Sequence, residues 1–130
     1  RQGQEAPDAL TDNAFPRASR LLLPKEFENV LRRRQIVVNV PPLQVIALAN
    51  DLAFPRLGLI VGKRVAPLAV DRNWLRRQVR ESFRRHATRL PPVDIVVQQR
   101  QKILGGTCDI AALLSDAWTR VAASSRVRVS

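Results

Sequence analysis

Arginine recurs six times in the stretch AVDRNWLRRQVRESFRR, residues 69–85, which holds only two acids, Asp71 and Glu81. On a helix that turns about 100° per residue, one side collects Asn73, Arg76, Arg77, Arg80 and Arg84. Like charges four residues apart destabilise a helix by about 0.2–0.5 kcal/mol per pair, and solvated helix faces usually mix signs. Guanidinium groups in a row suit phosphates through charge and forked donors. The spacing therefore predicts a surface that binds a nucleic-acid backbone, without distinguishing DNA from RNA.

The side chains that could catalyse a reaction do not occur at the spacings that known catalytic or metal sites require. A protein nuclease needs clustered carboxylates for a metal, or an acid–base pair. The 11 acids are scattered, and the only histidine, His86, falls on the apolar side of the arginine-rich helix. Ser82 and Cys108 have no evident base partner, and the glycines form no phosphate-binding loop. We therefore expect no catalytic residue and no metal ligand in the protein.

The elements that would position the arginines follow from periodicity and from proline and glycine breaks. Helices are expected at 24–34, at 71–88, and from Thr107 or Asp109 to about residue 123; strands are expected at 36–40, 43–50, 56–65 and 94–100. The apolar side of the second helix should pack on the sheet through Leu75, Val79, Ser82, Phe83, His86 and Leu90. This order predicts one α+β domain.

Length and composition agree with a single nucleic-acid-binding domain. The 130 residues carry a net charge of +11 and are 45% hydrophobic, so we expect a domain over 16–124. Residues 1–15 are expected to form a disordered arm and 125–130 a flexible tail. The single cysteine indicates a reducing compartment, and no apolar run is long enough to span a membrane. We expect a cytoplasmic protein without a membrane contact or an obligate protein partner.

Two segments together resemble the protein subunit of bacterial ribonuclease P. That family typically shows R-x-G-x-x-V-x-K-K/R and then A-V-x-R-N-x-x-K/R-R-x-x-R-E-x-F. The matching residues are Arg56, Gly58, Val61, Lys63, Arg64, Ala69, Val70, Arg72, Asn73, Arg76, Arg77, Arg80, Glu81 and Phe83. Phe27 and Val30 match an upstream F-x-x-V, and the resemblance spans about residues 17–122.

The resemblance implies an α-β-β-β-α-β-α two-layer sandwich, similar to a ribosomal-protein domain, with a left-handed β-α-β crossover. It implies a non-catalytic subunit of an endoribonuclease, whose catalytic RNA removes the 5′ leader from precursor tRNA with Mg²⁺ held mainly by RNA. The implied RNA-binding residues are Lys63, Arg64, Arg72, Asn73, Arg76, Arg77 and Arg80, and the helical stripe adds Arg84. The implied leader cleft lies between the first helix and the sheet, at Phe27, Leu31, Val45 and Ile46.

Two points stay open from the residues alone. Trp74 stands where the family has a second arginine, and it is suited equally to base stacking and to ordinary packing. The basic surface also fits a general RNA-binding or assembly protein of ribosomal type. An autonomous nuclease is disfavoured because nothing in the sequence supplies its chemistry.

Overall fold

The structure, a computed structural model, describes residues 20–103 and 109–129, with side chains as far as Ser124. Its elements are α2 (Pro24–Arg32), β1 (Ile36–Val40), β2 (Leu43–Ala49), β3 (Arg56–Ile60), α3 (Ala69–His86), the short 3₁₀ helix η2 (Ala87–Arg89), β4 (Val93–Gln99) and α4 (Ile110–Val129). The α+β class and the element order are confirmed. The expected arm at 1–15, the alternative cap Thr107 and Cys108 lie outside the described residues.

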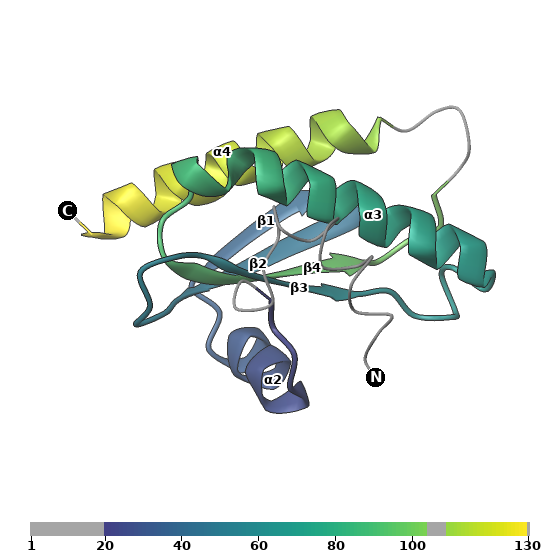
Figure 1. Cartoon of the computed structure of the whole chain (residues 1–130), viewed down its shortest axis with the longest axis horizontal. Helices are drawn as coiled ribbons and strands as arrows, with labels where there is room; N and C mark the ends of the chain where they lie inside the picture. The colour runs from purple at the N-terminus through teal and green to yellow at the C-terminus, as the bar shows by residue number, and fades with distance from the viewer. Residues whose placement is uncertain (1–19, 104–108, 130) are drawn as a thin grey trace, which may run out of the picture.

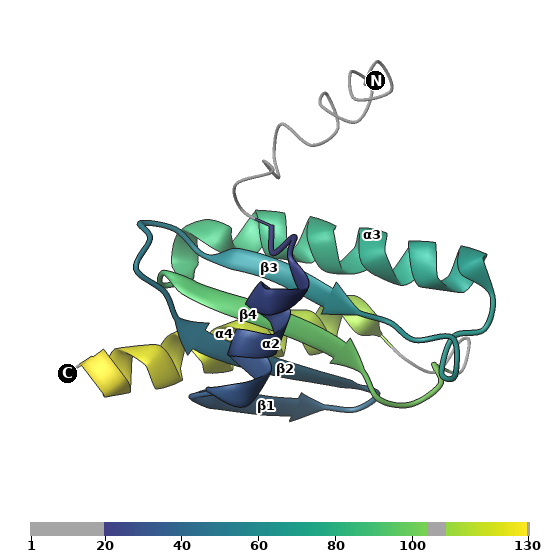
Figure 2. The same cartoon turned by 90° about the horizontal axis from the view of Figure 1, so that it is seen from below.

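The four strands form one sheet in the order β1-β2-β4-β3. β1 and β2 make a hairpin across the two-residue turn at Pro41 and Pro42, and β2 runs antiparallel to β4. β3 runs parallel to β4, and α3 connects them. Viewed with α3 in front and the strands pointing up, β4 lies to the left of β3 (Figures 1 and 2), so the crossover is left-handed as expected.

Helices cover both faces of the sheet. α3 and α4 form a layer on one face, and the short α2 crosses the other face alone (Figure 1). The larger core lies under α3 and α4, with Leu75, Phe83, Leu114 and Trp118 among its buried side chains. A smaller core under α2 holds Leu21, Val30, Ile46, Leu48 and Val96. The predicted two-layer sandwich therefore describes the sheet with α3 and α4, and α2 adds a partial layer behind it.

Several element boundaries differ from the sequence-based expectation, most by one or two residues. β3 ends at Ile60 rather than at residue 65, because the chain turns away there and the Ala66 N–H donates to Gly62 O at 3.1 Å. α3 begins at Ala69, two residues early. α4 begins where Asp109 Oδ1 accepts from the Ala112 N–H at 3.1 Å, so Asp109 acts as the predicted cap. α4 continues to Val129, since neither glycine nor proline follows Gly106 to stop it.

Candidate nucleic-acid interface

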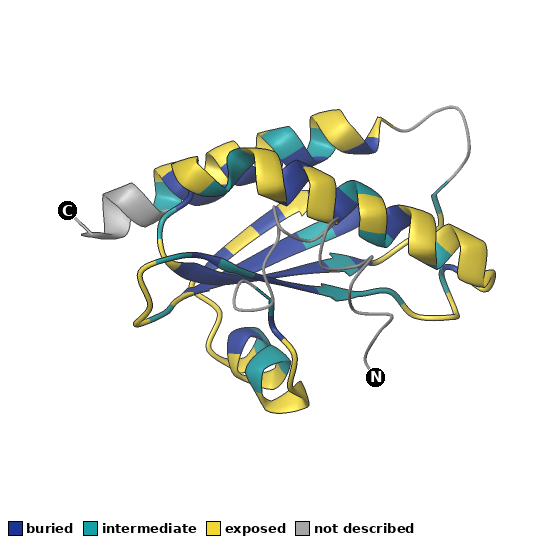
Figure 3. Ribbon diagram, in the orientation of Figure 1, coloured by how far each residue is buried: buried dark blue, intermediate teal, exposed yellow. Residues whose placement is uncertain are grey.

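Packing against α4 and the sheet sets the rotation of α3 about its own axis. Leu75, Val79 and Phe83 are buried, which confirms the predicted apolar side. The Trp118 indole N–H donates to Ser82 Oγ at 2.8 Å, and the Phe83 and Trp118 rings meet edge to face at 5.9 Å. These contacts leave α3 one outward side, which is exposed over most of its length (Figure 3).

The predicted cationic residues lie on that outward side and on the turn before α3. Asn73, Arg77, Arg80 and Arg84 are exposed on the helix, and Arg76 is half-buried beside them. Arg76 Nη1 donates to Asn73 Oδ1 at 3.1 Å, which orients the Arg76 guanidinium. Lys63 and Arg64 are exposed in the turn that follows β3. The helix thus presents its cations as one stripe, as its spacing predicts.

Arg72 and Arg84, both predicted to bind RNA, also have partners that bear on their roles. Arg72 Nη1 donates to Ala66 O at 2.8 Å and to Pro67 O at 3.1 Å, so it fastens the loop before α3 to the first helical turn. Arg84 forms an ion pair with Glu81, and this hydrogen bond is the main reason that the pKa of Glu81 is lowered. Positioning the loop is therefore the role that the geometry gives Arg72, and the charge of Arg84 is partly neutralised by Glu81.

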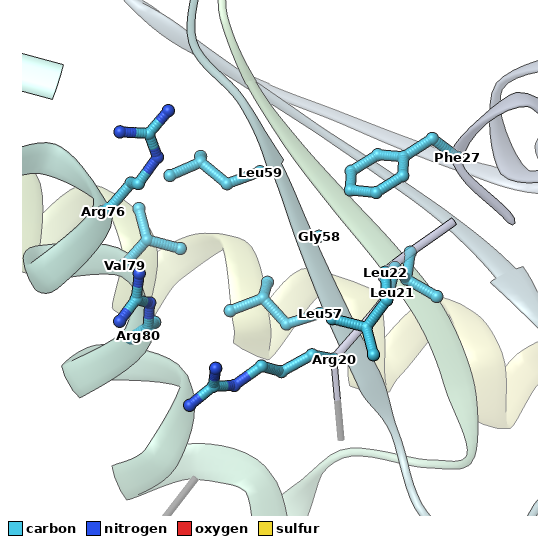
Figure 4. A pocket seen from close by; sticks show the side chains of 10 residues that line it. All are labelled: Arg20, Leu21, Leu22, Phe27, Leu57, Gly58, Leu59, Arg76, Val79 and Arg80. Carbon is cyan, nitrogen blue, oxygen red and sulfur yellow. The ribbon is translucent and has the colours of Figure 1, made fainter. Parts of the chain in front are cut away.

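A groove of about 230 Å³ crosses β3 between α3 and the segment that leads into α2. Arg76 and Arg80 line its side on α3, and Phe27 lines the opposite side (Figure 4). Arg20 extends toward α3 from the segment before α2 and adds a third guanidinium to the lining. Periodicity gave no signal for Arg20, because it lies outside every predicted element. The groove is therefore cationic along one wall and aromatic at the other.

The groove depends on Gly58 at its floor. A Cβ at Gly58 would lie 2.5 Å from Phe27 Cε2 and 2.8 Å from Phe27 Cζ, closer than non-bonded carbons approach. The Phe27 ring therefore rests directly on the backbone of β3. This close approach explains why glycine stands in the middle of an otherwise apolar strand.

The predicted leader-cleft residues do not all lie on the same face of the sheet. Phe27 and Leu31 are partly buried beside the core under α2, as the prediction requires. Ile46 points toward α2 but has no exposed surface. Val45 is also fully buried and belongs to the core under α3 and α4, so its placement in the cleft was wrong. The physical reason is strand alternation, which sends neighbouring side chains to opposite faces.

An ionic cluster that the sequence analysis missed holds α2 to the sheet. Arg56 Nε and Nη2 donate to the two carboxylate oxygens of Asp94 at 2.8 and 2.7 Å, and Arg56 Nη1 donates to Glu26 Oε2 at 3.1 Å. Glu26 Oε1 accepts the Leu22 and Leu23 N–H groups at 2.7 and 2.9 Å. The signal in the sequence was a lone arginine and a lone aspartate at the ends of two apolar strands.

The Glu26 carboxylate is stabilised in its charged form. The hydrogen bond from the Leu23 N–H is the largest influence that lowers its pKa, and the Leu22 N–H and the Arg56 charge act in the same direction. Hydrogen bonds to Asp94, together with the nearby carboxylate charges, raise the pKa of Arg56. The Glu26 and Asp94 carboxylates thus both pair with Arg56 and neutralise its charge.

Comparison with known proteins identifies the family. The family model described as Ribonuclease P matches residues 15–122. The ribonuclease P protein component of Chromohalobacter salexigens is 42% identical over 94 residues, covering 72% of this chain and 73% of that relative. The chain belongs to the ribonuclease P protein family.

Solved structures of ribonuclease P proteins share the fold. The protein from Thermotoga maritima superposes with a TM-score of 0.70 at 29% identity, covering 78% of this chain and 98% of that one. A Staphylococcus aureus RNase P protein mutant with defective mRNA degradation activity superposes with a TM-score of 0.68 over 93% of this chain; at 22% identity it supports the fold alone.

Membership of the family makes this chain a subunit of the ribonuclease P endoribonuclease, which acts in tRNA processing together with an RNA component. Within the part of the chain that the structure describes, there is no group of three or more His, Cys, Asp or Glu residues that could hold a metal ion. No helix in the same part is long and apolar enough to cross a membrane.

Proposed function

We propose that this ribonuclease P protein assists its catalytic RNA in the Mg²⁺-dependent removal of the 5′ leader from precursor tRNA, in the cytoplasm. The observation that carries the proposal is the groove across β3, where Arg76 and Arg80 face Phe27 over the bare backbone of Gly58. A single RNA strand offers phosphates to guanidinium groups and bases to an aromatic ring. A groove with one cationic wall and one aromatic wall matches both parts of such a strand.

The cations outside the groove are proposed to bind the catalytic RNA. Lys63, Arg64 and Arg77 are exposed on the turn before α3 and on the helix itself. Charges spread along a helix and a turn suit a folded RNA backbone better than a small anion. Arg72 is proposed to act indirectly, by holding the loop that presents Lys63 and Arg64.

The protein side of the complex is proposed to supply no catalytic group and no magnesium ligand. The Glu26 and Asp94 carboxylates, which hold α2 to the sheet, are both paired with Arg56. Mg²⁺ bound by the RNA and the substrate would polarise the scissile phosphate and generate the attacking hydroxide. The part left to the side chains of the protein is to bind and orient RNA.

Cleavage assays with the separate components test this division of labour. Precursor tRNA should be cut by the catalytic RNA with Mg²⁺, cut faster at low substrate concentration when the protein is added, and left intact by the protein alone. Cleavage by the protein alone would contradict the proposal. Binding of unrelated folded RNA without any stimulation of leader removal would favour a general ribosomal-type RNA-binding role.

The salt dependence of binding tests the cationic stripe directly. About five contacts to phosphates should give a slope of log K against log salt of about −4 to −5, from about −0.9 per phosphate. Arg76→Ala should flatten this slope by about one unit. The matched control is Arg120→Ala on α4, an exposed arginine paired with Asp116, which should leave the slope unchanged. An unchanged slope in Arg76→Ala would remove this part of α3 from the interface.

A further inference from the structure

The first turns of α3 carry an apolar surface that the fold does not use. Val70 and Trp74 lie one helical turn apart and are 67% and 38% exposed, and Leu68 just before the helix is 60% exposed. None of the three belongs to either core cluster of the described residues. Large apolar side chains that stay exposed on adjacent turns of one helix indicate a contact with a partner.

The charges around this apolar surface indicate which partner it meets. Arg77 follows Trp74 by three residues and is exposed on the next helical turn. Lys63 and Arg64 lie in the preceding turn, which Arg72 fastens to the start of α3. The only acid in the first turn of α3 is Asp71. An apolar protein partner would have to desolvate these cations, whereas an unpaired RNA base brings a stacking face and a phosphate together.

We propose that Trp74 is a base-stacking site, where an unpaired base of RNA stacks on the indole while Arg77 or Arg64 binds its phosphate. The site rests on the proposed RNA-binding function, but it lies outside the groove across β3. Because Arg64 and Arg77 are assigned to the catalytic RNA, the base is assigned to the same RNA, and the precursor tRNA is the alternative source that the test distinguishes.

The two tryptophans of the chain make the site directly observable. Trp118 is 2% exposed and its indole N–H is bonded to Ser82, so solvent and RNA do not reach it. Trp74 is the other tryptophan and is accessible. Stacking on a base should therefore quench the fluorescence of Trp74 and leave that of Trp118 unchanged.

Fluorescence titration with three probes locates the base. The probes are the transcribed catalytic RNA, the transcribed precursor tRNA, and a short single-stranded oligonucleotide. Quenching of the wild-type protein that is absent in Trp74→Phe supports the proposal, and the probe that saturates at the lowest concentration identifies the source of the base. Quenching by none of the three overturns the proposal.

Affinity measurements separate stacking from simple packing. Trp74→Phe keeps an aromatic face and should bind within about threefold of wild type, whereas Trp74→Leu should lose roughly 5- to 150-fold, the equivalent of about 1–3 kcal/mol per stacked base. Leu52→Ala, at a 40% exposed leucine in the loop between β2 and β3, is the matched control and should bind like wild type. Equal binding by Trp74→Leu and Trp74→Phe overturns the proposal.

Two further measurements keep the outcome interpretable. Thermal unfolding shows whether Trp74→Leu is folded, because an exposed side chain should change the melting temperature little. Sedimentation of the free protein tests self-association, and quenching that depends on protein concentration without RNA would replace the proposal with a contact between two copies. Suppose that RNA does not quench Trp74 and that Trp74→Leu binds like wild type, while Arg76→Ala still flattens the salt slope. The stacking site is then refuted and the proposed function stands.

Discussion

Gly58→Ala is predicted to destabilise the protein mainly through a clash with the Phe27 ring. The added Cβ would lie 2.5 and 2.8 Å from two ring carbons and 3.1 Å from Leu21 Cβ. Carbon atoms prefer a separation of about 3.5–4.0 Å, so the ring must move by about 1 Å. Overpacking of this kind costs about 1–3 kcal/mol, and the loss of glycine's freedom in the unfolded chain offsets about 0.4–1 kcal/mol of it. The net loss in unfolding free energy should be about 1–2 kcal/mol.

A double-mutant cycle isolates this steric cause. In a Phe27→Ala background the ring is gone, so Gly58→Ala should cost less than about 0.5 kcal/mol, with only the Leu21 contact remaining. Urea unfolding of the four proteins, extrapolated linearly to water, gives the coupling energy. We expect a coupling of about 1–2 kcal/mol. If the costs of the two substitutions add within about 0.3–0.5 kcal/mol, the ring does not rest on the backbone of β3 and the account of the groove floor fails.

Gly62 provides the matched control for Gly58. A Cβ at Gly62 would meet no atom within 4 Å, so Gly62→Ala should change the stability by no more than about 0.5 kcal/mol.

The same pair of variants, Gly58→Ala and Gly62→Ala, tests the function of the groove. Gly58→Ala should weaken precursor tRNA binding more than Gly62→Ala does, because only Gly58→Ala displaces Phe27.

Three further predictions concern the contacts that fix α2 and α3. Asp94→Asn should cost about 2–4 kcal/mol, somewhat less than a fully buried ion pair, because the Arg56 side chain is 21% exposed. Glu26 has a lowered pKa in the folded protein, so its contribution to stability should be complete above about pH 4.5 and should fall as the pH drops through the folded pKa. Ser82→Ala should cost about 1–3 kcal/mol by leaving the buried Trp118 N–H without its acceptor.

Urea unfolding checks each of these with its own control. Asp116→Asn breaks an exposed pair with Arg120 and should cost less than about 1 kcal/mol; a similar cost for Asp94→Asn would contradict the importance of the buried cluster. The stability difference between wild type and Glu26→Gln should shrink as the pH falls below about 4.5, and a constant difference would exclude the Glu26 carboxylate as its source. A loss below about 0.5 kcal/mol in Ser82→Ala would show that water replaces the hydroxyl.

The elements of the fold were largely predictable because their signals are local. The β-branched run of β1 ends at two prolines, and α3 has four buried residues at helical spacing. The end of β3 was missed because the apolar residues 61 and 65 continue its pattern after the backbone has turned away. The handedness of the crossover is a property of the whole sheet, which periodicity does not encode, so it came from the family resemblance alone.

The candidate site was predictable where one helix carries it and less so where several elements meet. The stripe on α3 followed from spacing within a single helix. Val45 was misplaced because a shift of one residue in strand register reverses the face. The pairing of Arg84 with Glu81 and of Arg72 with loop carbonyls depends on side-chain conformations. The contribution of Arg20 to the groove required tertiary structure, since no pattern links residue 20 to α3.

The segment before α2 also closes an edge that would otherwise be open. The Leu21 N–H donates to Leu57 O at 2.9 Å, and Arg20 bridges Leu57 in parallel, so the middle of β3 already has a neighbour on its outer side. Unpaired sheet edges recruit strands from other molecules and so promote aggregation. At high protein concentration, intermolecular strand addition should therefore begin at β1, the opposite edge, where Val37 is exposed. A lysine at position 37 would then improve solubility.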